Sequence, residues 1–196
     1  MEVLRQPLED GMVTISRAAG RLTYPCSVML VAAMNPCPCG YYGHPTRKCT
    51  CSEGSVKRYL SKVSGPLLDR IDLHVEVMPV EFADLSDRTK AESSAAIRER
   101  VNAARRIQNE RYKGTGINCN AMLTPAFLHQ YCVLTEGAQN MLKTAFERMG
   151  LSARAYDRIL KVARTIADLD GSEDIDVQHI AEALQYRSLD RKYWGN

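Results

Sequence analysis

The sequence predicts an α/β segment followed by an all-α segment. Runs with the alternating or continuous apolar character of strands lie before residue 80, whereas helical periodicity and capping residues dominate from residue 93 onward. This segregation is typical of two subdomains, one built on a sheet and one a helical bundle. With 45% hydrophobic and 25% charged residues, the 196-residue chain has the composition of an ordinary globular protein.

The sequence predicts neither a membrane-spanning helix nor a signal peptide. No apolar run approaches the roughly 18 residues needed to span a bilayer. The first ten residues lack the basic and then apolar order of a signal peptide. We therefore expect a cytoplasmic protein without a membrane partner. The formal net charge of +3 permits contact with nucleic acid but does not by itself argue for it.

The first 34 residues predict a helix end, a hairpin and a buried strand. A short helix closes at Gly11, because glycine readily adopts the left-handed conformation that ends helices. Residues 12–16 alternate apolar and polar side chains and residues 22–24 return after a turn, as in a β-hairpin. Residues 27–34 form a continuous apolar run of the kind that is buried on both faces of a parallel sheet.

Short helices and one more strand are expected before residue 80. Residues 56–63 have a helical pattern, and residues 66–70 predict a further helical turn. Leu73, Val75 and Val77 alternate with polar residues, and Pro79 ends that strand.

The remainder predicts one long helix and then four more. Residues 93–113 share an apolar face and stop at Gly114. The other four helices are expected to begin at capping residues, and these are Thr124, Thr135, Ser152 and Asp176. We expect three parts: residues 1–85 as the α/β part, residues 86–115 as a connecting helix, and residues 116–196 as the helical subdomain.

Three polar side chains are candidates for nucleotide chemistry. Asn35 follows the apolar run, at the strand end where ligands bind in open α/β sheets, but on spacing alone a plain turn before Pro36 explains it better. Arg70 is either paired with the adjacent Asp69 or Asp72, or offered to the nucleotide of a neighbouring subunit.

The third candidate lies in the first turn of a predicted helix. Arg154 is placed near the positive end of the helix dipole, which is an unfavourable position for a cation. That placement indicates a functional arginine, although an exposed charge on a basic helix explains it as well.

Four of the seven cysteines lie within fifteen residues, as Cys37, Cys39, Cys49 and Cys51. Four soft ligands in a short loop suit a tetrahedral Zn²⁺ site, although the spacing is C-x-C rather than the commoner C-x-x-C. Unliganded thiols or a disulfide pair are the alternatives, and His44 could replace one cysteine. A catalytic zinc is not expected, because four cysteines leave no open position. Cys119 and Cys132 are expected to be ordinary thiols.

Three stretches resemble one known family when they are taken together and in order. They are LRQPLEDGMVTISRAAGRLTYPCSVMLVAAMNPCPCGYYG, SGPLLDRIDLHVEV and LSARAYDRILKVARTIADL. The combination is similar to the magnesium-chelatase-like AAA+ ATPases of the ComM/YifB type, and the resemblance covers nearly the whole chain. It implies the C-terminal part of an AAA+ α/β domain followed by a small helical lid.

The resemblance also implies roles for individual residues. Asn35 matches the sensor-1 residue, Arg70 the arginine finger that acts on the adjacent protomer, and Arg154 the sensor-2 arginine that reaches the γ-phosphate. The hairpin matches one that lines the central pore in related ring motors, so Arg17 and Arg21 are candidates for contacting DNA. An exposed hairpin with two arginines is as often simply solvated.

The family's phosphate-binding elements are missing from this sequence. It contains no G-x-x-x-x-G-K-[ST] loop (Walker A) and no apolar strand ending in the acidic Walker B pair. We expect both to lie upstream of residue 1. ATP and Mg²⁺ are therefore expected as cofactors of the full-length parent, and this chain alone is expected to be inactive as an ATPase.

Family resemblance implies a ring motor that acts on DNA in recombination or branch migration, with adjacent protomers as partners. Two other functions remain open: a chelatase-type ATPase that remodels a protein partner, and a zinc-stabilised interaction module with no ATPase role. Basic residues on the helix at 93–113 fit DNA contact, but a solvated face explains them better; they are Arg98, Arg105, Arg106 and Arg111.

Overall fold

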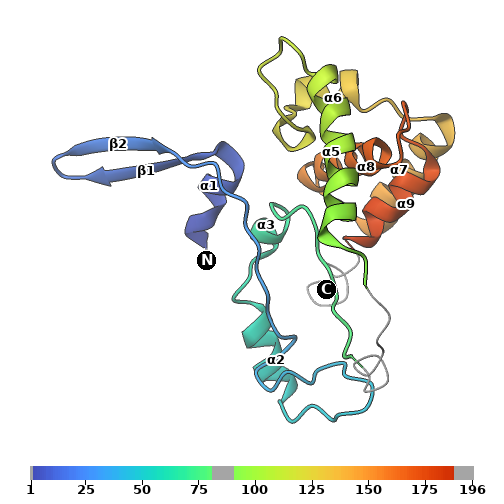
Figure 1. The fold of residues 1–196 in the computed structure, drawn as a ribbon. Coiled ribbons are helices and arrows are strands. Elements are labelled where there is room, and N and C mark those ends of the chain that lie inside the picture. Colours follow the sequence, from blue (N-terminus) through green and yellow to red (C-terminus); the bar gives the residue numbers. More distant parts are fainter. Residues whose placement is uncertain (1, 81–90, 188–196) are drawn as a thin grey trace. The chain divides into compact units, whose positions relative to one another are not determined.

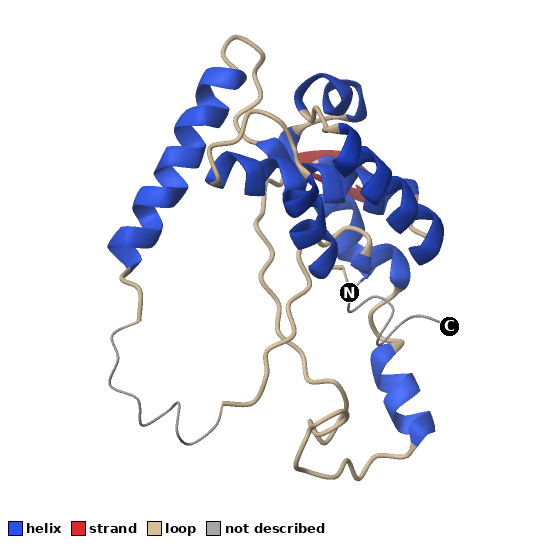
Figure 2. Ribbon diagram, turned by 90° about the vertical axis from the view of Figure 1, so that its right-hand side faces the viewer, coloured by secondary structure: helices blue, strands red, loops and turns tan. Residues whose placement is uncertain are grey.

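The structure is a computed structural model that describes residues 2–80 and 91–187. It divides into two compact units, one within Met1–Ile71 and one within Asp72–Ser188, and each is described by itself. Helices account for most of the regular structure, and one small sheet is present among the described residues (Figure 2). None of the described helices has the length and apolar character needed to cross a membrane.

The first unit begins with a helical turn and a hairpin. The helices η1 (Glu2–Leu4) and α1 (Arg5–Asp10) end at Gly11, whose φ of 63° is left-handed and whose N–H donates to the Pro7 oxygen. The strands β1 (Met12–Arg17) and β2 (Gly20–Pro25) pair antiparallel from Met12↔Pro25 to Arg17↔Gly20 (Figure 1). The predicted helix end and hairpin are thus confirmed.

Two short helices follow, and serine side chains define where they begin. The helix α2 (Glu53–Leu60) starts three residues before the predicted range, because the Ser52 hydroxyl accepts the N–H of Ser55 at 3.3 Å. The helix α3 (Gly65–Leu68) begins in the same way, with the Ser64 hydroxyl accepting the N–H of Leu67. Val63 and two leucines of α3 form a small core against Leu4 and Leu8.

The prediction of strands at residues 27–34 and 73–77 is wrong, because the structure has no strand in either segment. Both segments lack strand pairing among the described residues. Their apolar side chains are exposed, with Met29 at 91% and Val77 at 86%. A strand needs hydrogen-bonded neighbours. The pair β1–β2 is the one sheet in the described part of the chain, so no neighbours are available to either segment.

The second unit is a bundle of helices (Figure 1). Its helices are α5 (Ser94–Arg111), η2 (Asn120–Met122), α6 (Pro125–Tyr131), α7 (Glu136–Met149), α8 (Ala153–Leu169) and α9 (Val177–Gln185). Thr135, Ser152 and Asp176 cap their helices through side-chain oxygens, as predicted. Thr124 occupies the cap position of α6 without a side-chain cap bond.

The helix α8 forms the centre of this unit. It packs against α5, α6, α9 and η2, and α7 packs against α9. Ile159 and Ala163 of the predicted apolar stripe are buried, while Val162 and Ile166 pack at the edge of the core. The helix α5 contributes only its C-terminal half: Ala104 and Gln108 are buried, but Ile97 and Val101 of the same predicted face are exposed.

Candidate functional site

Asn35 lies at the end of the exposed apolar segment and beside the cysteine loop. A Cβ added to Gly40 would lie 3.9 Å from two atoms of the Asn35 amide, so the loop turns back over this side chain. Gly40 has a φ of 84°, a left-handed conformation that favours glycine, and its N–H donates to the Cys37 oxygen at 3.0 Å. The tight turn therefore lies directly beside the predicted sensor-1 residue.

Arg70 is held within the first unit by one distant and one nearby residue. Its guanidinium forms an ion pair with Glu9 of α1 and donates to the Pro66 oxygen at 2.7 Å. Only 11% of its side chain is exposed. The alternative of a pair with Asp72 is wrong, because Asp72 binds Arg158. The partner Glu9 is 61 residues away in sequence, which no local pattern indicates.

Arg154 is exposed in the first turn of α8, in the second unit. The cap of this helix is Ser152, whose hydroxyl accepts the Ala155 N–H at 3.1 Å. The two other arginines of α8 are more enclosed: the side chain of Arg158 is 19% exposed, and Arg164 is buried. Exposure and position in the first turn thus distinguish Arg154 from the other arginines of its helix.

Arg17 and Arg21 lie at the closed end of the hairpin. Arg17 pairs with Gly20 and Arg21 with Ser16, so Arg17 adjoins the two-residue turn and Arg21 lies one residue beyond it. Both are exposed. The strands are held in register by their backbone ladder and by a cross-strand contact between the Thr14 and Thr23 hydroxyls at 3.1 Å.

The four clustered cysteines converge in space. The Sγ atom of Cys37 lies 3.4 Å from that of Cys39 and 3.7 Å from that of Cys49, and Cys39 and Cys49 are 3.5 Å apart. All four sulfurs, including that of Cys51, lie within 4.8 Å of one another. Such a group could hold a metal ion. All seven cysteines are free thiols, so the disulfide alternative is wrong for this structure.

Backbone amides point at these sulfurs. The N–H groups of Tyr41 and Thr50 donate to Cys39 and lower its pKa to about 5. The pKa of Cys49 is raised to about 12: the N–H of Cys51 opposes this rise, but burial and the adjacent Cys39 and Cys37 sulfurs outweigh it. Because each thiolate disfavours the next, the cluster by itself loses its first proton far more readily than the others.

His44 and the remaining cysteines do not belong to this group. The Nδ1 atom of His44 accepts the N–H groups of Thr46 and Arg47, so the expectation that His44 could replace a cysteine is not met. Cys132 is buried in the second unit, where burial raises its pKa to about 11. Cys119 is half-buried.

A buried polar network in the second unit was missed by sequence reasoning. Asp168 of α8 is 2% exposed and accepts bonds from Arg111 at 3.0 Å, Asn120 at 2.8 Å and Arg164 at 3.1 Å. Arg164 also donates to the backbone oxygens of Ser172 and Glu173. The interpretation of Arg111 as part of a solvated or DNA-binding face is therefore wrong. A signal was present: Arg164 and Asp168 are four residues apart on the apolar side of α8.

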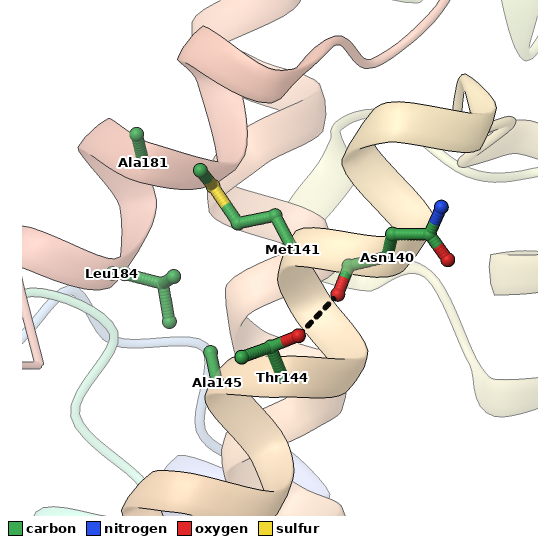
Figure 3. A pocket seen from close by; sticks show the side chains of 6 residues that line it. All are labelled: Asn140, Met141, Thr144, Ala145, Ala181 and Leu184. Atoms are coloured by element: carbon green, nitrogen blue, oxygen red, sulfur yellow. Dashed lines mark hydrogen bonds between the residues drawn. The ribbon is translucent and has the colours of Figure 1, made fainter.

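Figure 3 shows a shallow, open hollow between α7 and α9. Its lining is mostly apolar, with Met141, Ala145, Ala181 and Leu184 contributing carbon and sulfur atoms. The Thr144 hydroxyl is bound to the Asn140 backbone oxygen at 2.9 Å. None of the six lining residues is ionisable. The hollow therefore lacks the cationic groups that phosphate binding requires.

Comparison with known proteins matches both halves of the chain to one protein family. The family described as magnesium chelatase, subunit ChlI, matches residues 1–85. The family described as the C-terminal part of the same subunit matches residues 91–187. The two matches are consecutive and cover both units.

Individual relatives give the same result. The uncharacterized protein YifB of Escherichia coli is 42% identical over 193 residues, which cover 97% of this chain and 37% of YifB. The competence protein ComM of Haemophilus influenzae is 43% identical over 192 residues, covering 97% of this chain and 36% of ComM. An uncharacterized protein of Mycobacterium tuberculosis is 37% identical over 187 residues, covering 95% and 37%.

The chain thus spans a little more than a third of the length of these relatives. The relationship is established by identities of 37–43% across 95–97% of the chain, together with the two consecutive family matches. The chain belongs to the magnesium chelatase ChlI family, as a member of the ComM/YifB type.

Proposed function

We propose that this chain supplies Asn35, Arg70 and Arg154 to ATP hydrolysis by a longer AAA+ protein that works as a ring. The observation that carries the proposal is the position of Arg154, an exposed arginine in the first turn of α8, where the positive end of the helix dipole favours a bound anion. A γ-phosphate is such an anion. Guanidinium is suited to it, because its planar fork stays charged and binds phosphate oxygens through two N–H groups.

The three side chains would have different tasks at the nucleotide. Asn35 would orient the attacking water or contact the γ-phosphate through its amide. Arg70 would act on the nucleotide of the adjacent protomer, where it stabilises charge that develops on the phosphoryl oxygens. ATP and Mg²⁺ would be held by a phosphate loop in the longer protein. A ring is required by this scheme, because Arg70 and the nucleotide that it serves belong to different subunits.

The exposed apolar segments support an incomplete AAA+ sheet. Residues 27–34 and 73–80 carry large aliphatic side chains of which about half or more is exposed, such as Met29, Val31 and Val77. Apolar surface of this extent is normally covered. We propose that strands from the remaining two thirds of the longer protein pair with these segments, which places Asn35 at a strand end beside the nucleotide.

DNA is the proposed substrate of the motor. One relative is a competence protein by name, and the resemblance to the ComM/YifB type implies a motor that acts on DNA. Arg17 and Arg21 are exposed next to the hairpin turn, where a rigid two-stranded ribbon can present them to a phosphate backbone. Backbone contacts of this kind give affinity without sequence preference.

Replacing Arg17 and Arg21 by alanine in the longer protein should weaken binding of single-stranded DNA. Each lost phosphate contact lowers the slope of log affinity against log salt by about 0.7 for single strands. We therefore expect the slope to fall by about 1.4 for the double variant, measured by fluorescence anisotropy over a salt series. The matched control replaces Lys143 and Arg148, two exposed cations of α7, and should keep the original slope. An equal loss in both variants would argue against the hairpin.

The experiment that tests the function is ATP hydrolysis by the longer protein, with and without single-stranded and branched DNA. Hydrolysis stimulated by DNA is the expected result. Hydrolysis indifferent to DNA would contradict the DNA substrate and favour an ATPase that remodels a protein partner. Absence of hydrolysis would contradict the ATPase itself and leave the four-cysteine loop as the centre of an interaction module.

A further inference from the structure

We propose that Cys37, Cys39, Cys49 and Cys51 bind one Zn²⁺ ion in a closed, tetrahedral, structural site. The inference rests on the distances between the cysteine sulfur atoms. Zinc–thiolate bonds of about 2.3 Å at tetrahedral angles separate neighbouring sulfurs by about 3.8 Å. The sulfur separations of 3.4, 3.5 and 3.7 Å are close to this value. They are far longer than the roughly 2.05 Å of a disulfide bond.

The loop that carries the sulfurs is held in a tight turn. The Gly40 N–H donates to the Cys37 oxygen at 3.0 Å, and the φ of 84° at Gly40 is one that a residue with a side chain rarely adopts. This turn directly follows Cys39, and the sulfurs of Cys37 and Cys39 both lie within 3.7 Å of the Cys49 sulfur.

The module formed by residues 37–60 is too small to fold on its apolar core alone. Its buried cluster consists of Cys37, Val56 and Leu60, with Tyr59 and the other three cysteines packed at the edge. Burial of so few side chains stabilises the module only weakly, whereas ordering its backbone costs conformational entropy at every residue. Binding of a structural Zn²⁺ ion contributes directly to the folding of small modules and would offset that cost.

The ligand set selects zinc and a structural role. Thiolates are soft ligands that favour Zn²⁺ over Mg²⁺ or Ca²⁺. Four of them fill the tetrahedron and leave no position for water or substrate, so the site would not be catalytic. A Zn²⁺ ion with four thiolates carries a net charge of −2. Residues 37–62 contain five cations and one acid, which offset that charge; the cations are Arg47, Lys48, Lys57, Arg58 and Lys62.

The site has a consequence for Asn35, one that rests on the proposed ATPase. Cys37 follows Asn35 by two residues, and Gly40 of the metal loop lies against the Asn35 amide. A loop fixed by Zn²⁺ would hold this amide in one place. Removal of the metal from the longer protein, with assays in excess Mg²⁺, should therefore lower kcat for ATP with little change in KM. An unchanged kcat in zinc-free protein would overturn the inference that the metal holds Asn35.

The decisive test measures metal bound to the purified chain by mass spectrometry after growth with zinc. One Zn²⁺ per chain is expected, as is the strong visible absorption of a tetrahedral cobalt–thiolate site after exchange with Co²⁺. Cys39→Ser and Cys49→Ser should lose the metal, while Cys119→Ser, a change outside the cluster, should keep it. Metal-free wild-type protein, or full retention in Cys39→Ser and Cys49→Ser, would overturn the proposal.

A second measurement does not depend on variants that fold. In the wild-type chain, thiol alkylation followed by mass spectrometry should find Cys37, Cys39, Cys49 and Cys51 protected until a chelator is added. Cys132 serves as an internal reference, because its burial should keep it slow with or without chelator. Rapid alkylation of the four cysteines in zinc-loaded protein would contradict the site.

Discussion

Replacing Asp168 by alanine is expected to destabilise the helical unit by about 3–5 kcal/mol, enough to unfold much of it at 37 °C. The carboxylate is fully enclosed and accepts bonds from Arg111, Asn120 and Arg164. Arg164 is itself 1% exposed, so removal of Asp168 leaves a buried guanidinium without its counter-charge. A buried charge without a partner costs far more than a surface ion pair contributes.

Chemical denaturation of the chain, followed by circular dichroism, measures this effect. The matched control is Asp170→Ala, two residues further along. Its carboxylate is 57% exposed and contacts Gln178 and His179. We expect that change to cost under about 1 kcal/mol. If the two variants unfold at the same denaturant concentration, the buried network does not stabilise the unit.

Replacing Arg70 by alanine is expected to lower ATP hydrolysis by the longer protein by about 10³-fold or more, which is the range found for arginine fingers. A lysine at this position should restore only a small part of the rate, because it keeps the charge but loses the planar fork. ATP binding should change little, because the arginine acts on the transition state at another subunit. Steady-state kinetics and nucleotide binding on the same preparations separate these effects.

The contact of Arg70 with Glu9 requires a control for structural damage. Glu9→Gln removes the ion pair in the first unit and keeps the guanidinium. It should leave hydrolysis largely intact if Arg70 acts on nucleotide. Equal losses in Arg70→Ala and Glu9→Gln would instead assign Arg70 to the support of α1. Mixing Arg70→Ala protein with a variant that lacks the phosphate-loop lysine tests action between subunits: rescue of hydrolysis is expected.

Helix positions in the second unit were predictable because their signals are local. Thr135, Ser152 and Asp176 bind backbone N–H groups within three residues of themselves. Gly150 ends α7 with a left-handed φ of 60°. Interactions this short in sequence do not depend on the rest of the fold. The hairpin at residues 12–25 was predictable for the same reason, since its strands are neighbours along the chain.

Candidate site residues could be located in sequence, but their surroundings could not. Only the structure pairs Arg70 with Glu9, assigns Arg111 to the buried network and excludes His44 from the cysteine cluster. The four cysteines were the exception. They are close in sequence, so any compact loop brings them together.

The sequence by itself determined the helix caps, the hairpin, the family and the clustering of the cysteines, because each depends on residues that are near one another or on an ordered set of motifs. The tertiary structure alone decided which polar groups share a buried site and which apolar runs lack strand partners. Asp168 and Asn120 are 48 residues apart, and the run at 27–34 is exposed because the described chain holds no strand beside it. Pairing across such distances depends on which surfaces meet, and one-dimensional periodicity does not record that.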